Sequence, residues 1–232
     1  MTITVDEIVR RVRSAIDELM VNQSQFLTES TDEANLTNVI VDKIGYALMH
    51  VIGNAPIEKL DDDMLEVLTA EELQGFSIDA TSKVATLVLP DYLRIVEARL
   101  SSWSHFPIPE SDMSQVYLMQ QDQYARGSWD RPVNILTHNG SGKRILEMYC
   151  AKEATGANKD TLIFVFVRKP VIHAATQDPP APAYVDCPAK LEAALIYQVA
   201  GLAMVAFREE VAKSLFQIAD RYLYNDDKGG SE

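Results

Sequence analysis

Cysteine is scarce in this sequence, which has Cys150 and Cys187 among its 232 residues. The two lie far apart in unrelated contexts, so they form neither a disulfide framework nor the paired spacing of a zinc site, and a reducing compartment is predicted. The four histidines are separated from one another by 33 residues or more, and none lies near a cysteine at ligand spacing. We therefore expect no bound metal and no other cofactor.

The common catalytic and phosphate-binding motifs are also missing. The stretch HNGSGKR around Gly142 ends like a phosphate-binding loop, but Thr137 stands where that motif needs its first glycine, and Arg144 where it needs serine or threonine. The sequence has no Gly-x-Ser-x-Gly turn for a nucleophilic serine. We expect no enzymatic activity. An active site assembled from distant residues, around His138 and the segment 119–133, stays open as an alternative.

Hydrophobic runs of membrane-spanning length are absent. The longest uncharged stretch near the C-terminus, 193–207, has 15 residues, and Arg208 and Glu209 follow it directly. A spanning helix needs roughly 20 apolar residues. The first residues, MTITVDEIVRR, lack the basic-then-apolar layout of a signal peptide. We expect neither membrane insertion nor secretion.

Acidic residues outnumber basic ones, 34 to 21, and the formal net charge is −13. The net charge is −11 over residues 1–80, +2 over 81–176 and −4 over 177–232. An acidic chain is poorly suited to gripping nucleic acid, which requires clustered lysine and arginine. A negative surface can still face DNA that slides past it, although acidity that serves solubility alone explains the same composition.

Helices are predicted in the first third of the chain. Thr4 and Glu7 form a capping box before a helix, and Ser30 and Glu33 form a second one. Apolar residues then recur at about one turn. In the first helix these are Ile8, Val12, Ile16 and Leu19, and in the second Leu36, Ile40, Ile44, Leu48 and Val51. A shorter, acidic helical piece is predicted over 57–73.

Beyond residue 80 the pattern changes to that of strands. Strands are predicted over 83–90, 92–103 and 161–169, the last as a central strand because its apolar run is continuous. Two apolar arms flank the sequence Asn-Gly-Ser-Gly at 139–142, which predicts a hairpin. Since no helix-length segment separates the later strands, we expect four or five antiparallel strands.

The apolar C-terminal part, 189–223, is predicted as one continuous helix about 50 Å long. It carries two apolar stripes rotated by about 100°, wider than one partner requires. A central core helix packed on several sides explains both stripes. In the alternative, one stripe packs on a neighbouring copy, and the candidate assembly interface then comprises Ile196, Met204, Phe207, Val211, Leu215, Ile218 and Tyr222.

The predicted fold class is α+β. N-terminal helices and a long C-terminal helix form a helical bundle, and a small antiparallel β unit is inserted in it. The expected divisions are a bundle over 1–80 and 189–224, a β-rich unit over 81–175, a proline-rich extended linker over 176–188 and a flexible tail over 225–232.

The segment 119–133, MQQDQYARGSWDRPV, holds two aromatic residues and two arginines just before the hairpin. Tyrosine, tryptophan and arginine are over-represented at interface hot spots. Tyr124, Arg126 and Trp129 are therefore candidate interface residues. A loop pinned on the β unit by its two aromatic side chains explains the same pattern.

Three stretches resemble structural proteins of crAss-like and related large-tailed bacteriophages. They are LPDYLRIVEARLSSW at 89–103, QQDQYARG at 120–127 and RPVNIL at 131–136. The resemblance runs from about residue 84 to 149, and Tyr124, Arg126, Gly127 and Pro132 are its most specific points. The helical N-terminal part and the C-terminal helix are similar in layout only.

The resemblance implies a ring-forming adaptor or connector between portal and tail, combining helices, a small β unit and an extended arm. Its partners would be further copies in a homo-oligomeric ring, the portal, and other neck or tail proteins. DNA would be only a passing cargo, without sequence-specific binding, and no membrane would be involved. The expected location is the head–tail junction of the virion, after synthesis in the host cytoplasm. The alternative is a soluble monomeric or dimeric regulatory or binding module.

Overall fold

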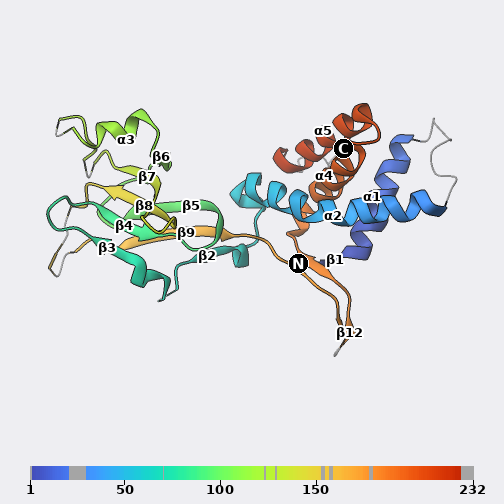
Figure 1. The fold of residues 1–232 in the computed structure, drawn as a ribbon, viewed down its shortest axis with the longest axis horizontal. Coiled ribbons are helices and arrows are strands. Elements are labelled where there is room, and N and C mark those ends of the chain that lie inside the picture. The colour runs from blue at the N-terminus through green and yellow to red at the C-terminus, as the bar shows by residue number, and fades with distance from the viewer. Residues whose placement is uncertain are drawn as a thin grey trace, which may run out of the picture. The chain divides into compact units, whose positions relative to one another are not determined.

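The chain divides into two compact units, each with its own core. We call Met1–Met64 together with Lys169–Glu232 the helical unit, and Leu65–Arg168 the β unit (Figure 1). Each is described by itself. The computed structural model describes residues 2–20, 30–69, 71–122, 124–128, 130–152, 155–156, 159–177 and 180–225.

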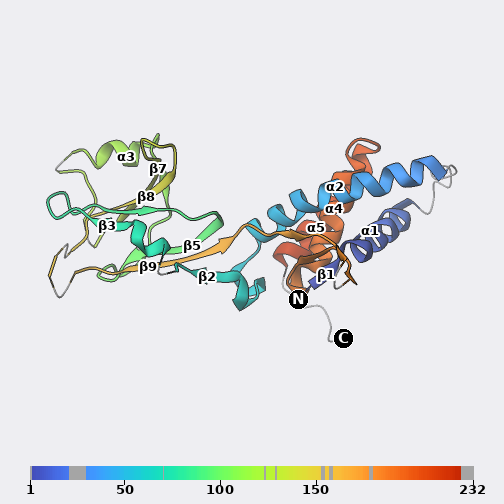
Figure 2. The same ribbon diagram turned by 60° about the horizontal axis from the view of Figure 1, so that its bottom comes forward.

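The α-helices described in the helical unit are α1 (Val5–Met20), α2 (Ser30–Asn54), α4 (Glu192–Met204) and α5 (Glu209–Tyr224). Short 3-10 helices lie at Ile57–Lys59, Asp62–Met64 and Ala189–Leu191. Helix α4 contacts α1, α2 and α5, so it is the central element of this unit (Figure 2).

The inward faces predicted for the first two helices are confirmed. The side chains of Ile8, Val12 and Ile16 are buried in α1, and all five residues predicted for α2 are buried as well. The side chain of Leu19 lies outside the described residues. Helix α2 ends at Asn54, between Gly53 and Pro56, residue types that are common at helix ends.

The start of α1 is fixed by charge and by a cap. The Thr4 hydroxyl accepts a hydrogen bond from the Glu7 N–H at 3.2 Å, as the capping box predicts. Hydrogen bonds from Arg10 and Arg11 hold the pKa of the Glu7 carboxyl at about 2. Arg11 also pairs with Glu192 of α4 at 3.0 Å, so these charges link α1 to the central helix.

Helix α4 is apolar almost all round because other helices enclose it. Nine of its 13 residues are buried, and α1, α2 and α5 pack against it. For the first half of the apolar C-terminal segment, the central-core interpretation is therefore confirmed.

The single long helix predicted over 189–223 is wrong. Helix α4 ends at Met204, and the backbone of Arg208 is extended, with φ −151° and ψ 96°. Helix α5 then returns along α4 as the second arm of a helical hairpin. Glu209 and Glu210 occupy the first turn of α5, where the positive end of the helix dipole stabilises acidic side chains.

The hairpin requires a glycine in α4. A Cβ added at Gly201 would lie 2.5 Å from a ring carbon of Phe216 in α5, so the ring occupies the space of the missing side chain. Gly45 in α2 differs, because a Cβ there would meet its nearest atom, in Ile172, at an ordinary 3.5 Å.

Gly201→Ala and Gly45→Ala should therefore change stability in opposite directions. Replacing a mid-helix glycine by alanine favours the helix by about 1 kcal/mol, whereas overpacking a core costs about 1–3 kcal/mol. We expect Gly45→Ala to raise the free energy of unfolding and Gly201→Ala to lower it, as measured by urea denaturation. Equal stabilisation by both substitutions would contradict the close packing of Phe216 on α4.

The helix predicted over 57–73 is wrong. This stretch forms two 3-10 helices, the short strand β2 (Leu65–Val67) and a third 3-10 helix at Glu72–Gly75. The Lys59 side chain, in the first of these 3-10 helices, is buried. Its Nζ donates hydrogen bonds to the carbonyl oxygens of Tyr222 at 2.9 Å and Asn225 at 2.6 Å. A cation at this position interacts favourably with the negative, C-terminal end of the α5 dipole.

Strands are also present in the helical unit. Strand β1 (Thr2–Thr4) pairs with β13 (Tyr184–Asp186), which pairs on its other side with β10 (Ile172–His173). Strands β11 (Thr176–Gln177) and β12 (Pro180–Ala181) form a separate two-stranded sheet. We call residues 174–183 the ribbon arm; Figure 1 shows it extending away from the helices of its own unit.

The β unit contains two sheets. One has the order β2-β9-β5, with β5 at Tyr92–Leu100 and β9 at Leu162–Arg168. The other has the order β3-β4-β8-β7-β6. Its strands are Phe76–Ile78, Ala85–Val88, Arg144–Tyr149, Val133–His138 and Glu110–Ser111, in that order. Neighbouring strands are antiparallel except β6 and β7, which are parallel. The predicted hairpin and the central strand β9 are confirmed.

The core of the β unit draws side chains from both sheets. Trp103, which follows β5, is only 2% exposed, and its Nε1–H donates to the Cys150 carbonyl at 3.3 Å. The buried Asn134 of β7 donates from Nδ2 to the Ala98 carbonyl of β5 at 2.8 Å. The two sheets are thus joined by apolar packing and by polar contacts.

The predicted fold class, a helical bundle with a small β unit, is wrong. Over the described residues the chain is 40% helical and 27% strand, with 13 strands in four sheets and five α-helices. The error has two physical causes. Strands of two or three residues show no alternating pattern that a sequence could reveal, and the apolar C-terminal segment folds back on itself.

The boundaries of the two units can be compared with the expected divisions of the chain. The chain passes from one unit to the other at Met64–Leu65 and at Arg168–Lys169. The segment 176–188, expected as a linker, contributes β11, β12 and β13. Apart from Asn225, the expected tail 225–232 lies outside the described residues.

Candidate functional site

The loop that precedes β7 in the β unit contains Tyr124, Arg126 and Gly127, which are among the most specific points of the resemblance to phage proteins. Buried hydrogen bonds fix the shape of this loop. Helix α3 (Gln115–Met119) precedes it, and the Ser114 hydroxyl caps that helix by accepting from the Tyr117 N–H at 3.3 Å. The Gln120 side chain, 8% exposed, donates to the Val116 carbonyl at 2.8 Å and accepts from the Gly127 N–H at 3.0 Å. One buried amide thus ties the loop to α3.

Gly127 is required by the close approach of two backbone segments. A Cβ at this position would lie 2.8 Å from the carbonyl oxygen of Arg131 and 3.0 Å from the Val133 side chain. The Ser128 N–H donates to that Arg131 carbonyl at 3.1 Å, which closes the turn. Gly127 therefore serves close packing, a role that glycine has wherever two backbones meet.

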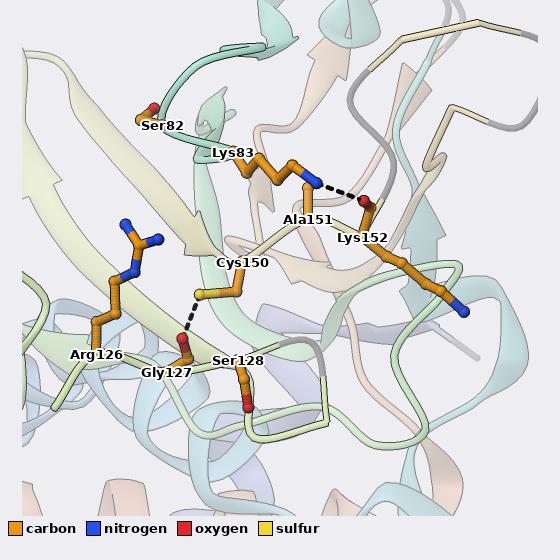
Figure 3. A pocket seen from close by; sticks show the side chains of 8 residues that line it. All are labelled: Ser82, Lys83, Arg126, Gly127, Ser128, Cys150, Ala151 and Lys152. Atoms are coloured by element: carbon orange, nitrogen blue, oxygen red, sulfur yellow. Dashed lines mark hydrogen bonds between the residues drawn. The ribbon is translucent and has the colours of Figure 1, made fainter. Parts of the chain in front are cut away.

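This loop forms one wall of a pocket of about 490 Å³ (Figure 3). The pocket is lined by Ser82, Lys83, Arg126, Gly127, Ser128, Cys150, Ala151 and Lys152. Figure 3 shows the Arg126 and Lys83 side chains on opposite sides of Cys150, whose sulfur points to the Gly127 carbonyl. Among the described residues that line the pocket, three are basic and none is acidic.

Two of the lining residues have an unusual backbone conformation. Lys83 (φ 55°) and Cys150 (φ 72°) are the non-glycine residues with positive φ in the part of the chain that the structure describes. They lie at the same end of the paired strands β4 and β8, and the Ala151 N–H donates to the Lys83 carbonyl at 2.9 Å. Such conformations cost about 1–3 kcal/mol each and cluster at functional sites.

Cys150 is a neutral thiol in this environment. Burial raises its pKa above the ordinary value, although the nearby Arg126 charge opposes the shift. Its S–H donates to the Gly127 carbonyl. Because the neutral form is favoured in the folded state, this contribution to stability is present below the ordinary thiol pKa and is lost as pH rises through the raised one.

Cys150 should react slowly with iodoacetamide at neutral pH. Only the thiolate reacts, so we expect the alkylation rate at pH 8 to be below that of free cysteine and to keep rising above pH 9. Cys187 should react more slowly still, since burial raises its pKa to about 12. Peptide mass spectrometry can assign the label to either residue. A Cys150 rate that levels off near pH 8 would contradict a neutral, partly buried thiol.

The candidate interface residues of the loop have different surroundings. The Tyr124 side chain is 95% exposed, and Arg126 lines the pocket. Trp129 lies outside the described residues. The loop is pinned by the hydrogen bond between Gln120 and Gly127, and the Tyr124 side chain lies on the surface.

The candidate interface residues of the C-terminal segment are divided between the core and the surface. Ile196, Met204 and Leu215 are buried within the chain itself, whereas Phe207 is 57% and Tyr222 42% exposed. The remaining two, Val211 and Ile218, are half-buried. Tyr222 also stacks on Tyr197 of α4, with ring centroids 5.6 Å apart. The buried stripe of α5 consists of Leu215, which was among the candidates, together with Ala212, Ala219 and Leu223.

A run of exposed apolar side chains in the β unit was missed by sequence reasoning. These residues lie between β5 and the loop, around β6 and α3. They are Phe106, Ile108, Met113, Leu118 and Met119, with exposed fractions from 47% to 92%. Their segment repeats its apolar residues at neither the helical nor the strand period. The signal that could have identified them is the presence of large apolar residues in an irregular stretch that contains several prolines and serines.

Other kinds of site are not found in the described part of the chain. No group of three or more His, Cys, Asp or Glu residues there is placed to hold a metal ion. No helix among the described residues is long and apolar enough to cross a membrane. His173 stacks on Tyr184 and contacts Asp186 at 2.9 Å, which joins β10 to β13.

No protein-family model matches this chain, and no curated protein is significantly similar to it.

Proposed function

We propose that this protein is a subunit of a ring-forming head–tail connector of a tailed bacteriophage, which joins the portal to the tail and lines the DNA passage. The proposal starts from the resemblance of residues 84–149 to structural proteins of crAss-like phages. Its role is mechanical, and it requires neither a cofactor nor a catalytic residue.

The ribbon arm is the observation that carries the proposal. Strands β11 and β12 pair only with each other in the described sheets, and six of the eight described residues of the arm are exposed. An isolated two-stranded ribbon is marginally stable in water. A ring subunit supplies the missing contact, because the arm of one copy can pack on the next through a heterologous interface.

Charge supports a DNA passage lined by the helical unit. This unit has 21 acidic and 11 basic residues, whereas the β unit has 13 and 10. DNA phosphates are repelled by an acidic surface, so DNA can move past it without being held. The acidic surface also disfavours sequence-specific DNA binding.

Exposed apolar side chains supply the surface for contacts with other subunits. Phe106, Ile108 and Met113 in the β unit, and Val205 and Phe207 at the α4–α5 turn, are 47–92% exposed. Side chains of this kind are buried when a subunit enters an assembly.

Purified virions provide the direct test. We expect mass spectrometry to detect this chain in particles that retain their tails, in many copies per particle. Deletion of 176–181 should leave the melting temperature of the purified protein nearly unchanged and prevent its incorporation into particles. Absence of the chain from purified virions would overturn the proposal and favour a soluble regulatory or binding module.

A further inference from the structure

We propose that the pocket between Arg126 and Lys83 in the β unit binds an oxyanion, which is a phosphate or a carboxylate group. The inference concerns this chain alone and does not depend on its place in a virion. It goes beyond the connector role, since a mechanical subunit needs no ligand.

The charge of the pocket is opposite to that of the chain. The protein has 13 more acidic than basic residues, yet the pocket-lining residues that the structure describes include three cations and no carboxylate. The guanidinium of Arg126 makes no hydrogen bond or ion pair with any residue that the structure describes. An arginine guanidinium can hold a carboxylate or phosphate through two parallel hydrogen bonds.

The surrounding hydroxyl groups are already engaged, which defines how a ligand would be held. Ser82 donates to the Asp79 carboxylate at 2.9 Å, and Ser128 donates to the Asp130 carboxylate. The Lys83 Nζ donates to the Lys152 carbonyl at 3.1 Å and retains two further donors. We therefore expect Arg126 to be the main contact of the ligand. Figure 3 shows the Lys83 amine directed toward the Lys152 carbonyl, so Lys83 would contribute through its two remaining donors.

The backbone around the pocket is preorganised. Lys83 and Cys150 keep their positive φ values, while Trp103 and Ala151 hold the adjoining carbonyl groups by hydrogen bonds. The loop that carries Arg126 is fixed by the hydrogen bond from the Gly127 N–H to Gln120 and by the close packing of Gly127 against the Arg131 carbonyl. A rigid frame lowers the entropy cost of holding a ligand.

The size of the pocket fits an oxyanion carried on a larger molecule. At about 490 Å³ the pocket falls in the range of small-molecule sites, roughly 300–1,000 Å³. A protein side chain, such as glutamate, and a free phosphate offer the same chemistry to Arg126. Two probes distinguish these sources: inorganic phosphate and a hexaglutamate peptide.

Isothermal titration of the full chain with each probe tests the proposal. We expect saturable binding of at least one probe, weakened by at least about tenfold in Arg126→Gln because hydrogen bonds to a charged group are lost. Lys143→Gln removes the same charge from the exposed β7–β8 turn and should leave the affinity within about twofold, which screening allows for a distant charge. Tighter binding of phosphate identifies a free anion as the ligand, and tighter binding of the peptide identifies a protein carboxylate.

Alkylation of Cys150 gives a second, independent readout. An occupant next to the sulfur should slow its reaction with iodoacetamide in the wild type and in Lys143→Gln, but not in Arg126→Gln. The melting temperature of each variant shows whether its fold is intact. If neither probe binds, or if Arg126→Gln and Lys143→Gln weaken binding equally, the proposal is overturned.

Discussion

Replacing Trp103 by alanine should destabilise the β unit by about 3–5 kcal/mol, as is typical when a buried tryptophan is removed. Trp103 is 2% exposed in the cluster that joins the two sheets, and its indole N–H satisfies the Cys150 carbonyl. Both the packing and the hydrogen bond are lost in the variant. Urea denaturation followed by far-UV circular dichroism measures the change, and we expect strand signal to be lost at lower urea than helix signal.

Trp103→Phe is the matched control. It keeps most of the apolar volume and removes the hydrogen bond, so we expect a loss of about 1–3 kcal/mol, the cost of an unsatisfied buried carbonyl. Because this carbonyl belongs to Cys150, the alkylation rate of its thiol should also rise. Trp103→Ala with an unchanged denaturation curve would show that the indole is not part of the core.

Leu215→Ala and Phe207→Ala should separate folding from assembly. Leu215 is fully buried in the α4–α5 hairpin, and its truncation should lower the free energy of unfolding by about 2–5 kcal/mol. Phe207 is 57% exposed, so its truncation should change stability by less than about 0.5 kcal/mol. Urea denaturation of the two variants, side by side with the wild type, measures both effects.

The two variants should differ again in a particle-assembly assay. If Phe207 meets a neighbouring subunit, Phe207→Ala reduces incorporation into virions at unchanged stability. Incorporation of Leu215→Ala should fall only as far as its folded fraction does. A stable Leu215→Ala protein would contradict its place between α4 and α5. Full incorporation of Phe207→Ala would show that this residue is not part of the interface between subunits.

Elements with strong local signals were predicted from the sequence. The turn at 139–142 is set by Asn139, whose side chain accepts from the Ser141 and Lys143 N–H groups at 3.1 and 2.9 Å. Such contacts involve neighbours in the sequence, so a short motif reveals them. The same holds for the apolar faces of α1 and α2, which repeat at the helical period.

Elements that depend on distant partners were not predicted. The end of α4 shows no proline, and Gly201 lies inside the helix. The chain turns back because α5 has a buried stripe that α4 covers, with Gly201 opposite Phe216. The pair of acidic residues after Arg208 was the local signal for a new helix start. Strand β1 is fixed only by its pairing with β13.

The candidate site was predicted in part for the same reason. Residue types that favour interfaces identified Tyr124 and Arg126, because those types are recognisable one residue at a time. Lys83 and Cys150 reach the same pocket through the pairing of β4 with β8. No short motif contains that juxtaposition.

The order of the two units along the chain affects how the protein is made. The β unit is one continuous segment, Leu65–Arg168, whereas the helical unit is built from the two ends of the chain. During synthesis the β unit can therefore fold as soon as it leaves the ribosome, as contiguous domains do. Helices α1 and α2 must wait for α4, the element that covers their apolar faces. A chain cut short before residue 192 and released from the ribosome would thus have a folded β unit and two exposed amphipathic helices, the state in which a chaperone would be needed.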